Sequence, residues 1–228
     1  MRTIGLLGGM SWLSTVEYYR IMNEEVSARL GGAHSASLVL RSFDFHDIEE
    51  LQRTDWDEAA RVLADAGVAL VDAGAEALMI CTNAMHKVAE QVEAASGVPL
   101  LHIADALAAV ILADGHSTVG LLGANYTMLG EYYVGRLRKR GLEVLVPDEE
   151  DRAIVDDVIF SELVRGIFSD ESRAEYLRII EQLHHEGATA TILGCTEIPL
   201  LVRPEDTDIP LYDSTQVHAL AGVEWMLR

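Results

Sequence analysis

The two halves of the amino-acid sequence repeat each other, and this repeat restricts the fold more than any other feature. The matched segments are, in chain order, TIGLLGG at Thr3 and TVGLLGA at Thr118, EYY at Glu17 and Glu131, Cys81 and Cys195, and VPLLHIAD from Val98 and IPLYDST from Ile209. Their offsets are nearly constant, at 118 − 3 = 115, 131 − 17 = 114, 195 − 81 = 114 and 209 − 98 = 111 residues. Every α/β protein alternates apolar strands, glycines and helices, which explains the shared glycines. It does not explain a cysteine at the matching place in each half, so we predict a duplication that yields two related lobes.

Short apolar runs that end in glycine or small residues alternate with longer amphipathic segments along the chain. This alternation is typical of β-α units around a parallel sheet, whose strands are buried on both faces. The expected strands span residues 3–7, 36–41, 77–81, 99–102, 117–122, 143–146, 190–194 and 209–212. We therefore predict an α/β fold with two pseudo-symmetric lobes, each a parallel sheet flanked by helices, and an active site in the cleft between them.

The length of the chain sets the expected division into lobes. With 228 residues, 50% of them hydrophobic, each lobe is able to bury a core. The first lobe is expected to comprise residues 1–98, completed by residues 208–228, and the second lobe residues 99–207. No low-complexity linker separates them, and the crossover segment HIADALAAVILADGHS is helical in pattern. We therefore expect closely packed lobes.

The charge and the cysteine content exclude several classes of protein. A formal net charge of −20 argues against general affinity for nucleic acid or anionic membranes, because both require a basic surface. Two cysteines do not make a disulfide framework, so a reducing compartment is expected. Glycines interrupt the N-terminal MRTIGLLGGM before a signal-peptide core forms, and no run reaches the roughly 18 apolar residues of a membrane span. We expect an unanchored cytoplasmic protein whose partner is a small-molecule substrate.

Each cysteine follows an apolar run that is interpreted as the third strand of its lobe. In open parallel sheets, ligands bind beyond the carboxyl ends of the strands, where the following helices point their N-termini. The backbone N–H groups around Thr82 and Asn83, and around Thr196 and Glu197, are expected to favour negative charge. A thiolate would be stabilised there, since the thiol pKa of about 8.5 falls near a helix N-terminus.

The first loop of each lobe is the second candidate binding element. In GLLGGMSWLSTVEYY, Gly8 and Gly9 permit a tight turn, and Ser14 followed by Glu17 fits a capping box at the start of a helix. The residues placed at the edge of the cleft are Met10, Ser11 and Trp12 in this loop, and Asn125, Tyr126 and Thr127 in its equivalent GLLGANYTMLGEYY. Backbone and hydroxyl donors in such loops suit a carboxylate ligand.

Two acid/base groups on opposite sides of one carbon can remove a proton from one face and return another to the opposite face. Such a reaction inverts a stereocentre. Thiols suit it, because modest changes of environment bring their pKa near the operating pH. The resting protein would hold one thiolate and one thiol with coupled titrations. The alternative is a pair of buried inert cysteines, the commonest state of a lone cysteine, and the pairing argues against it.

Other ligands fit the sequence less well. GLLGGMS lacks the G-x-G-x-x-G spacing of a dinucleotide loop, and no acidic residue ends the second strand. A zinc site needs about four ligands, and the chain has no C-x-x-C pair. A pyridoxal phosphate enzyme needs a lysine in its site, and Lys87 and Lys139 are the only lysines. We therefore expect neither cofactor nor metal.

The motifs LLGGMSW, CTNAMHKVA and GCTEIPLL, carried by two homologous lobes, resemble the cofactor-independent aspartate/glutamate racemase family. The resemblance covers nearly the whole chain, and CTNAMH together with SFDFHDIEELQ is similar to a branch that includes broad-specificity amino-acid racemases. It implies a homodimer and a two-base mechanism in which Cys81 and Cys195 exchange donor and acceptor roles. The substrate-lining positions that it implies are Met10, Gln52, Thr82, Asn83, Thr127 and Thr196; the loop analysis adds Ser11.

One departure from the family concerns side-chain specificity. Aspartate racemases that resemble this chain use a lysine in the segment ELVRGIF to meet a substrate carboxylate, where this sequence has Val164 with Arg165 beside it. Arg41, at the end of the second strand, is a further candidate for the distal carboxylate, with a plain surface arginine as the alternative. The expected activity is racemisation of aspartate or glutamate. The alternatives are a racemase of broader range, a hydantoin racemase, maleate isomerase or decarboxylase on the same scaffold, and a binding protein for a small acid.

Overall fold

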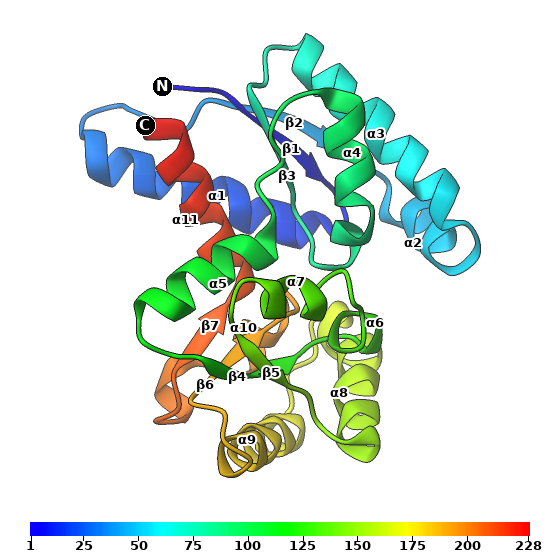
Figure 1. The fold of residues 1–228 in the computed structure, drawn as a ribbon, viewed down its shortest axis with the longest axis vertical. Coiled ribbons are helices and arrows are strands. Elements are labelled where there is room, and N and C mark those ends of the chain that lie inside the picture. Colours follow the sequence, from blue (N-terminus) through cyan, green and yellow to red (C-terminus); the bar gives the residue numbers. More distant parts are fainter. The chain divides into compact units, whose positions relative to one another are not determined.

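The chain folds into two compact units, which are called the first and second lobes from here on. The computed structural model describes all residues from Met1 to Arg228. The first lobe comprises Met1–Ile103 and Thr215–Arg228, and the second comprises Ala104–Ser214 (Figure 1). No helix is both long enough and apolar enough to cross a membrane.

The first lobe is built on a three-stranded parallel sheet. Its strands are β1 (Ile4–Gly8), β2 (Leu38–Ser42) and β3 (Ala77–Ile80), in the spatial order β2-β1-β3. Leu6 in the central strand lies opposite Leu40 on one side and Met79 on the other. Leu100 adds a single parallel bridge to Leu78 at the β3 edge. The helices between and after these strands are α1 (Trp12–Leu30), α2 (Phe45–Thr54), α3 (Trp56–Asp72), η1 (Ala84–Val88), α4 (Ala89–Ser96) and α11 (Ser214–Leu227), where η denotes a 3-10 helix.

The second lobe has the same arrangement of strands, with a fourth strand where the first lobe has only the Leu100 bridge. Its strands are β4 (Thr118–Leu122), β5 (Glu143–Leu145), β6 (Ala190–Leu193) and β7 (Leu211–Asp213), all parallel in the order β5-β4-β6-β7. The strands β4 and β6 therefore occupy the places of β1 and β3, and β7 occupies the place of the Leu100 bridge. The helices are α5 (Ile103–Ala113), α6 (Asn125–Met128), α7 (Val134–Lys139), α8 (Glu149–Ser161), η2 (Leu163–Arg165), α9 (Asp170–His185), α10 (Ile198–Leu201) and η3 (Pro204–Asp206). The identical strand order supports a duplication.

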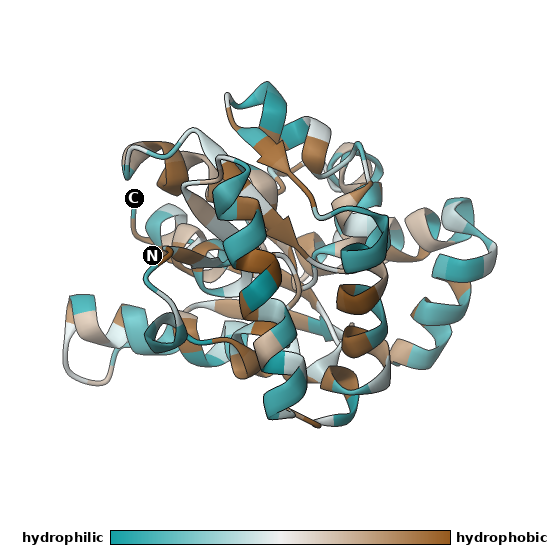
Figure 2. Ribbon diagram, turned by 90° about the horizontal axis from the view of Figure 1, so that it is seen from below, coloured by the Kyte–Doolittle hydropathy of each residue, from teal (hydrophilic) through white to brown (hydrophobic).

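Side chains of the first sheet alternate between two apolar cores, as the two-residue period of a strand requires. One core contains residues of α3 and α4 together with Leu7, Leu78 and Ile80. The other contains residues of α1 and α11 together with Ile4, Leu6, Met79 and Cys81. Helices thus cover both faces of the sheet, and the strands are among the most hydrophobic parts of the ribbon (Figure 2). It follows that the side chain of Cys81 points toward α1 and α11.

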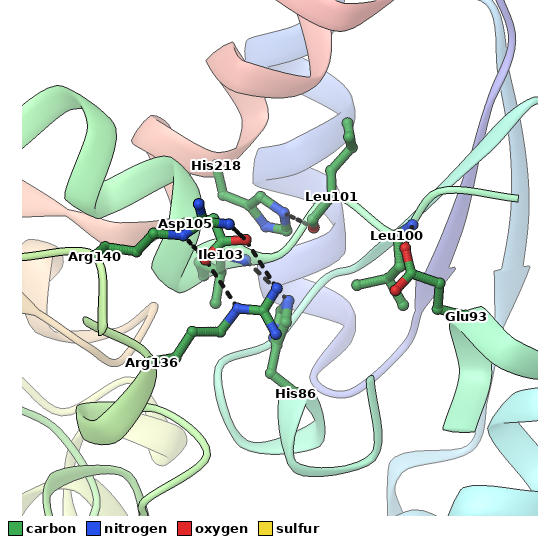
Figure 3. A network of polar contacts seen from close by, with 9 residues as sticks. All are labelled: His86, Glu93, Leu100, Leu101, Ile103, Asp105, Arg136, Arg140 and His218. Atoms are coloured by element: carbon green, nitrogen blue, oxygen red, sulfur yellow. Dashed lines mark hydrogen bonds and ion pairs between the residues drawn. The ribbon is translucent and has the colours of Figure 1, made fainter. Parts of the chain in front are cut away.

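Two helices belong to the lobe that the chain enters next: the helix after the Leu100 bridge and the helix after β7. Helix α5 follows Leu100, yet Asp105 anchors it in the second lobe through ion pairs with Arg136 and Arg140 at 2.8 and 2.7 Å (Figure 3). Burial opposes ionisation of Asp105, but hydrogen bonds and charge from the two arginines outweigh it and hold its pKa well below the usual range. Helix α11 follows β7, yet it packs into the core of the first lobe through Ala219 and other apolar residues.

Short polar side chains begin several of the helices. The N-cap side chains that accept a backbone hydrogen bond are Asp44 for α2, Asp55 for α3, Asp148 for α8 and Ser169 for α9, at 3.0 to 3.1 Å. Each satisfies one of the amide donors that the first helical turn leaves without an internal partner. These caps explain where the connecting loops stop and the helices start.

The prediction of an α/β fold with two parallel sheets flanked by helices is confirmed. Seven of the expected strands are present, each with bounds within two residues of the expectation. The expected strand at 99–102 is reduced to the bridge between Leu100 and Leu78. The reason is length: the chain enters α5 at Ile103, so too little of it runs beside β3 to form a ladder.

The expected lobe boundaries require a correction. The sequence assigned residues 99–103 to the second lobe and residues 208–214 to the first, and the structure has both assignments reversed. Pairing explains the first reversal, because Leu100 bonds to β3 of the first sheet. It also explains the second, because Leu211 in β7 pairs with Thr191 in β6. The chain crosses between lobes after the Leu100 bridge of the first sheet and after β7 of the second sheet, and not before them.

Candidate active site

Cys81 follows directly after β3, at the carboxyl end of the first sheet. Its N–H donates to the Leu7 carbonyl at 2.9 Å, which continues the ladder of β1 and β3 by one residue. The side chain has no exposed surface, and burial raises the pKa of the thiol above its ordinary value. Cys81 is therefore a neutral thiol in this conformation. The expectation of a thiolate stabilised by a following helix does not hold here, because only the short η1 comes next.

The loop after Cys81 is fixed by polar contacts within the first lobe. The Thr82 carbonyl accepts a hydrogen bond from the ring of His86 at 2.8 Å. Asn83 is buried, and its carbonyl accepts from the His86 backbone N–H at 3.2 Å. Gln52, on α2, donates from Nε2 to the Met85 sulfur at 3.0 Å. Gln52 therefore lies beside the loop that follows Cys81.

The loop after β1 lies at the same carboxyl end of the first sheet. Met10 is buried, and Ser11 is the N-cap of α1. The Thr15 hydroxyl accepts from the Gly9 N–H at 2.8 Å and donates to the Ser11 carbonyl at 3.1 Å. The turn is thus closed by one threonine.

The expected capping box at Ser14 and Glu17 is wrong. Helix α1 begins at Trp12, so Ser14 lies inside its first turn, where it is buried with its hydroxyl 3.3 Å from that of Ser11. Glu17 instead pairs with Arg20 at 2.6 Å on the exposed side of the helix. The Ser-x-x-Glu pattern occurred by chance three residues after the real start.

Gly9 gives a direct test of the turn after β1. Its φ of 87° is strained for any residue with a side chain, and an added Cβ would lie 2.3 Å from the Phe43 carbonyl oxygen. We expect Gly9→Ala to lower the free energy of unfolding by roughly 3 kcal/mol, through backbone strain and overlap together. Gly97→Ala is the matched control, because Gly97 also has a positive φ of 70°, in the left-handed α region, but nothing within 4 Å of its Cβ position. The control should lose only about 1 kcal/mol in urea unfolding, and equal losses would contradict the overlap.

Cys195 lies at the equivalent end of the second sheet, two residues after the last residue of β6. Its thiol donates to Oε2 of Glu197 at 3.1 Å, and the Thr196 hydroxyl donates to the same oxygen at 2.7 Å. Glu197 is buried, whereas Cys195 is partly exposed. Burial and the Glu197 carboxylate raise the pKa of Cys195 well above its ordinary value, and backbone N–H groups of Glu197 and Ile198 oppose them only in part. The expected effect of the backbone is therefore present but outweighed.

The loop after β4 lies beside Cys195 within the second lobe. Thr127, on α6, is buried, and its methyl carbon is 3.7 Å from the position that a Cβ on Gly194 would take. Asn125 donates its N–H to Asp156 Oδ1 on α8 at 2.7 Å. Burial is the main cause that raises the pKa of Tyr126 and of Tyr176 above the ordinary range, and nearby Cys195 adds to it. Both phenols are neutral neighbours of the thiol.

The candidate cationic residues lie outside these loops. Arg41 is exposed on β2, with its guanidinium carbon 5.3 Å from the centre of the Phe43 ring. Arg165 is exposed in η2, next to the half-exposed Val164. The ammonium of Lys87 lies 4.0 Å from the centre of the Trp56 ring, so this lysine has a structural partner. Lys139 is exposed at the end of α7.

Each lobe therefore brings its sequence-predicted residues to the carboxyl end of its own sheet. The first lobe gathers Met10, Ser11, Gln52, Cys81, Thr82 and Asn83, and the second gathers Thr127, Cys195 and Thr196. The sequence analysis missed the side chain of Glu197. A signal was available: at the offset of 114, Asn83 aligns with 83 + 114 = 197, so the matched triplets CTN and CTE differ only in their third residue, which carries an amide in one and a carboxylate in the other.

Two parallel sheets of one strand order, each with a cysteine after the equivalent strand, define a duplicated α/β scaffold of the racemase class. The sequence matches the Asp/Glu/hydantoin racemase family over residues 7–222, and the chain belongs to that family. It is thus an enzyme of the racemase class, and the resemblance noted from the motifs is confirmed.

Solved structures and a characterised relative agree with this assignment. A Yersinia pestis protein assigned to the Asp/Glu racemases is 50% identical over 100% of both chains, with a TM-score of 0.96. An aspartate racemase homologue from Pyrococcus horikoshii is 32% identical over 100% of both chains, with a TM-score of 0.89. The broad-specificity amino-acid racemase RacX of Bacillus subtilis is 24% identical over 173 residues, which cover 76% of this chain and 74% of RacX.

Proposed function

We propose that this protein is a cofactor-independent racemase of aspartate or glutamate that uses Cys81 and Cys195 as its two acid/base groups. The observation that carries the proposal is a free cysteine after each of the equivalent strands β3 and β6. The Pyrococcus horikoshii relative, an aspartate racemase homologue at 32% identity over the full length, supports the substrate class. Hydroxyl and amide groups in the loops of both lobes supply donors for a carboxylate.

In the proposed reaction, a thiolate removes the α-hydrogen as a proton and becomes a thiol. The electron pair of the broken C–H bond stays on the α-carbon, next to the substrate carboxylate. The opposite thiol then delivers its proton to the other face and becomes the thiolate. Loop donors at Thr82, Asn83 and Thr196 hold the carboxylate, so that the charge developing beside it is stabilised by fixed dipoles. Roles reverse with the hand of the substrate.

The proposal also assigns a role to Glu197. Its carboxylate accepts the Cys195 thiol proton at 3.1 Å and adds negative charge beside the sulfur. Both effects favour the protonated form of Cys195, so this thiol is suited to be the proton donor for one hand of the substrate and must first lose its proton to act on the other hand. Cys81 has the neutral Asn83 at the equivalent position, so no carboxylate there opposes its ionisation when the substrate is bound.

A proton NMR experiment in D2O tests the proposal. Purified protein is incubated with L- and D-aspartate, L- and D-glutamate and L-alanine, without pyridoxal phosphate and with EDTA. Deuterium should enter the α-position of both hands of one acidic amino acid, and the opposite hand should accumulate. No exchange and no inversion with any acidic substrate would contradict the proposal.

A broader substrate range is the second candidate function. Its support is the 24% identity to RacX over 173 residues, together with Val164 at the place where aspartate racemases that resemble this chain have a lysine. In the same experiment, exchange into L-alanine at a rate comparable to L-aspartate would favour this candidate. If the protein instead strongly prefers acidic substrates, two variants locate the contact with the distal carboxylate. Loss of the preference in Arg165→Ala, with the preference retained in Arg41→Ala, would assign that contact to Arg165.

A further inference from the structure

His86 has both ring nitrogens in use, and this fixes its protonation state. The Ile103 backbone N–H can only donate, and it donates to Nε2 at 3.2 Å. Nε2 therefore carries a lone pair, and Nδ1 carries the proton that is donated to the Thr82 carbonyl at 2.8 Å. The side chain is buried in η1. Burial, with the charges that His102 and His218 would carry, lowers the pKa of His86 well below its ordinary value, so the ring is neutral.

These two hydrogen bonds join the loop after Cys81 to the end of the first lobe. Thr82 directly follows Cys81, so its carbonyl sets the orientation of the peptide between Thr82 and Asn83. Ile103 is the last residue of the first lobe before the chain enters the second. Figure 3 shows His86 beneath the backbone of Ile103. One imidazole thus ties the cysteine loop to the point where the chain leaves the lobe.

His218 ties the returning chain to the same place. Its Nε2 donates to the Leu101 carbonyl at 2.7 Å (Figure 3). Its Nδ1 accepts from the Tyr18 hydroxyl at 2.7 Å. The ring centre lies 5.5 Å from that of His86, and the His86 ring lies 4.5 Å from His102. Burial lowers the pKa of His218 to about 4. Two neutral rings, His86 and His218, therefore bond the segment at residues 101–103 to the loop after Cys81 and to α11.

We propose that His86 is a positioning residue for Cys81: it fixes the Thr82 carbonyl against Ile103 and so holds the thiol in the orientation needed for proton transfer. The inference rests on the proposed function for its catalytic consequence. The geometry itself does not depend on that function. Loss of the Nδ1–H donor leaves the Thr82 carbonyl without its ring partner, so the peptide between Thr82 and Asn83, one residue after Cys81, gains freedom to rotate. Loss of the Nε2 acceptor affects Ile103 alone.

Two substitutions separate these contacts. In His86→Asn the amide nitrogen lies near the place of Nδ1, so it keeps the donor to Thr82 and loses the acceptor for Ile103. In His86→Gln the longer side chain carries an amide oxygen toward the place of Nε2, so it keeps the acceptor and loses the donor. His116→Asn is the control, because this half-buried histidine belongs to the second lobe, where its Nδ1 lies 2.9 Å from Thr189 Oγ1 and its ring lies edge-on to Tyr212.

We expect His86→Gln to lower kcat at least about tenfold more than His86→Asn, with KM little changed, because misplacing a reacting group slows the chemical step. A readout that needs no racemase activity is the rate at which iodoacetamide alkylates Cys81, followed by peptide mass spectrometry. That rate should rise in His86→Gln relative to His86→Asn, while the Cys195 rate stays the same in both. His116→Asn should match the wild type in both assays.

Equal kcat values and equal Cys81 alkylation rates in the two folded His86 variants would overturn the proposal. If racemisation is absent in the wild type, the proposed function fails, and the alkylation rates still decide the positioning role. The ¹⁵N shifts of the wild-type histidines give a measurement that needs no variant. They should show His86 as the neutral Nδ1–H tautomer near pH 7, and an Nε2–H or doubly protonated ring would overturn the assignment.

Discussion

Replacing either cysteine by serine is expected to lower kcat/KM for racemisation by at least about a thousandfold, at the upper part of the range for loss of a general acid or base. A serine hydroxyl keeps the size and the donor capacity of the thiol. It does not ionise at neutral pH, so it cannot take the α-proton. The equilibrium constant between mirror-image substrates is one, so kcat/KM must fall equally in both directions. Either Cys81→Ser or Cys195→Ser should therefore abolish inversion of both hands.

Solvent exchange distinguishes loss of one base from loss of the site. In D2O, Cys81→Ser should still exchange the α-hydrogen of the one enantiomer that presents it to Cys195, and Cys195→Ser should exchange only the other. Thr191→Val is the control, since Thr191 is buried in β6 with a hydroxyl that has no hydrogen-bond partner. Its activity should equal that of the wild type, because removing an unsatisfied hydroxyl disturbs nothing that holds Cys195. Full racemisation with either cysteine replaced would refute the two-base mechanism.

The burial of Cys81 adds a requirement to that mechanism. The side chain has no exposed surface, so no substrate reaches the sulfur in this conformation. The proposed mechanism therefore requires a motion that uncovers Cys81, and opening steps of this kind limit kcat in many enzymes.

The sequence predicted the strands well because buried parallel strands leave a simple pattern. The runs at Ile4, Thr118 and Ala190 are apolar over the whole length of a strand and end at glycine or cysteine, so their position is set by local composition. The start of α1 was misplaced because Ser11 and Ser14 are both good caps, and only the bond from Gly9 to Thr15 selects the earlier one. A sequence pattern alone does not choose between two possible N-caps when a tertiary contact decides between them.

The parts of the site that the sequence missed depend on contacts between distant segments. The lobe boundaries followed from which sheet accepts Leu100 and Leu211, and a strand sequence does not specify its neighbour. The environment of each thiol also depends on packing. Cys81 shares a core with α1 and α11, which lie far from it in the chain, and this burial raises its pKa. The matched positions of the cysteines were readable from the repeat; their unequal surroundings were not.

The two cysteines differ in their surroundings, and this difference predicts the second large effect, on the alkylation rate of Cys195. Glu197→Gln is expected to raise the alkylation rate of Cys195 at neutral pH by about tenfold, because a charge-assisted hydrogen bond to the thiol becomes a neutral one. The sign follows from the charge. Negative Glu197 disfavours the thiolate and raises the pKa of Cys195, so its removal lowers that pKa and moves the alkylation profile to lower pH. Gln keeps an oxygen that can still accept from the thiol.

The other ionisable groups around Cys195 do not change in this experiment. Tyr126 and Tyr176 remain neutral, because burial raises the pKa of both phenols above the ordinary range. Asp156 keeps its hydrogen bond from the Asn125 N–H at 2.7 Å. The shift in the Cys195 profile therefore reports on Glu197, and the Cys81 profile in the same sample serves as the internal control.

The duplication offers the reciprocal variant. Asn83→Asp places a carboxylate beside Cys81 at the position that Glu197 has beside Cys195, so it should raise the pKa of Cys81 and slow its alkylation, with no effect on Cys195. Since Cys81 must become the thiolate in the proposed cycle, kcat should fall in Asn83→Asp and the pH at which it is half-maximal should rise. Mass spectrometry of both cysteine peptides across pH 6 to 10 measures the two profiles together.

The outcome that would contradict the role of Glu197 is that the Cys195 profiles of the wild type and Glu197→Gln coincide. The carboxylate would then not set the protonation of this thiol, and the division of roles between the two lobes would have to be abandoned.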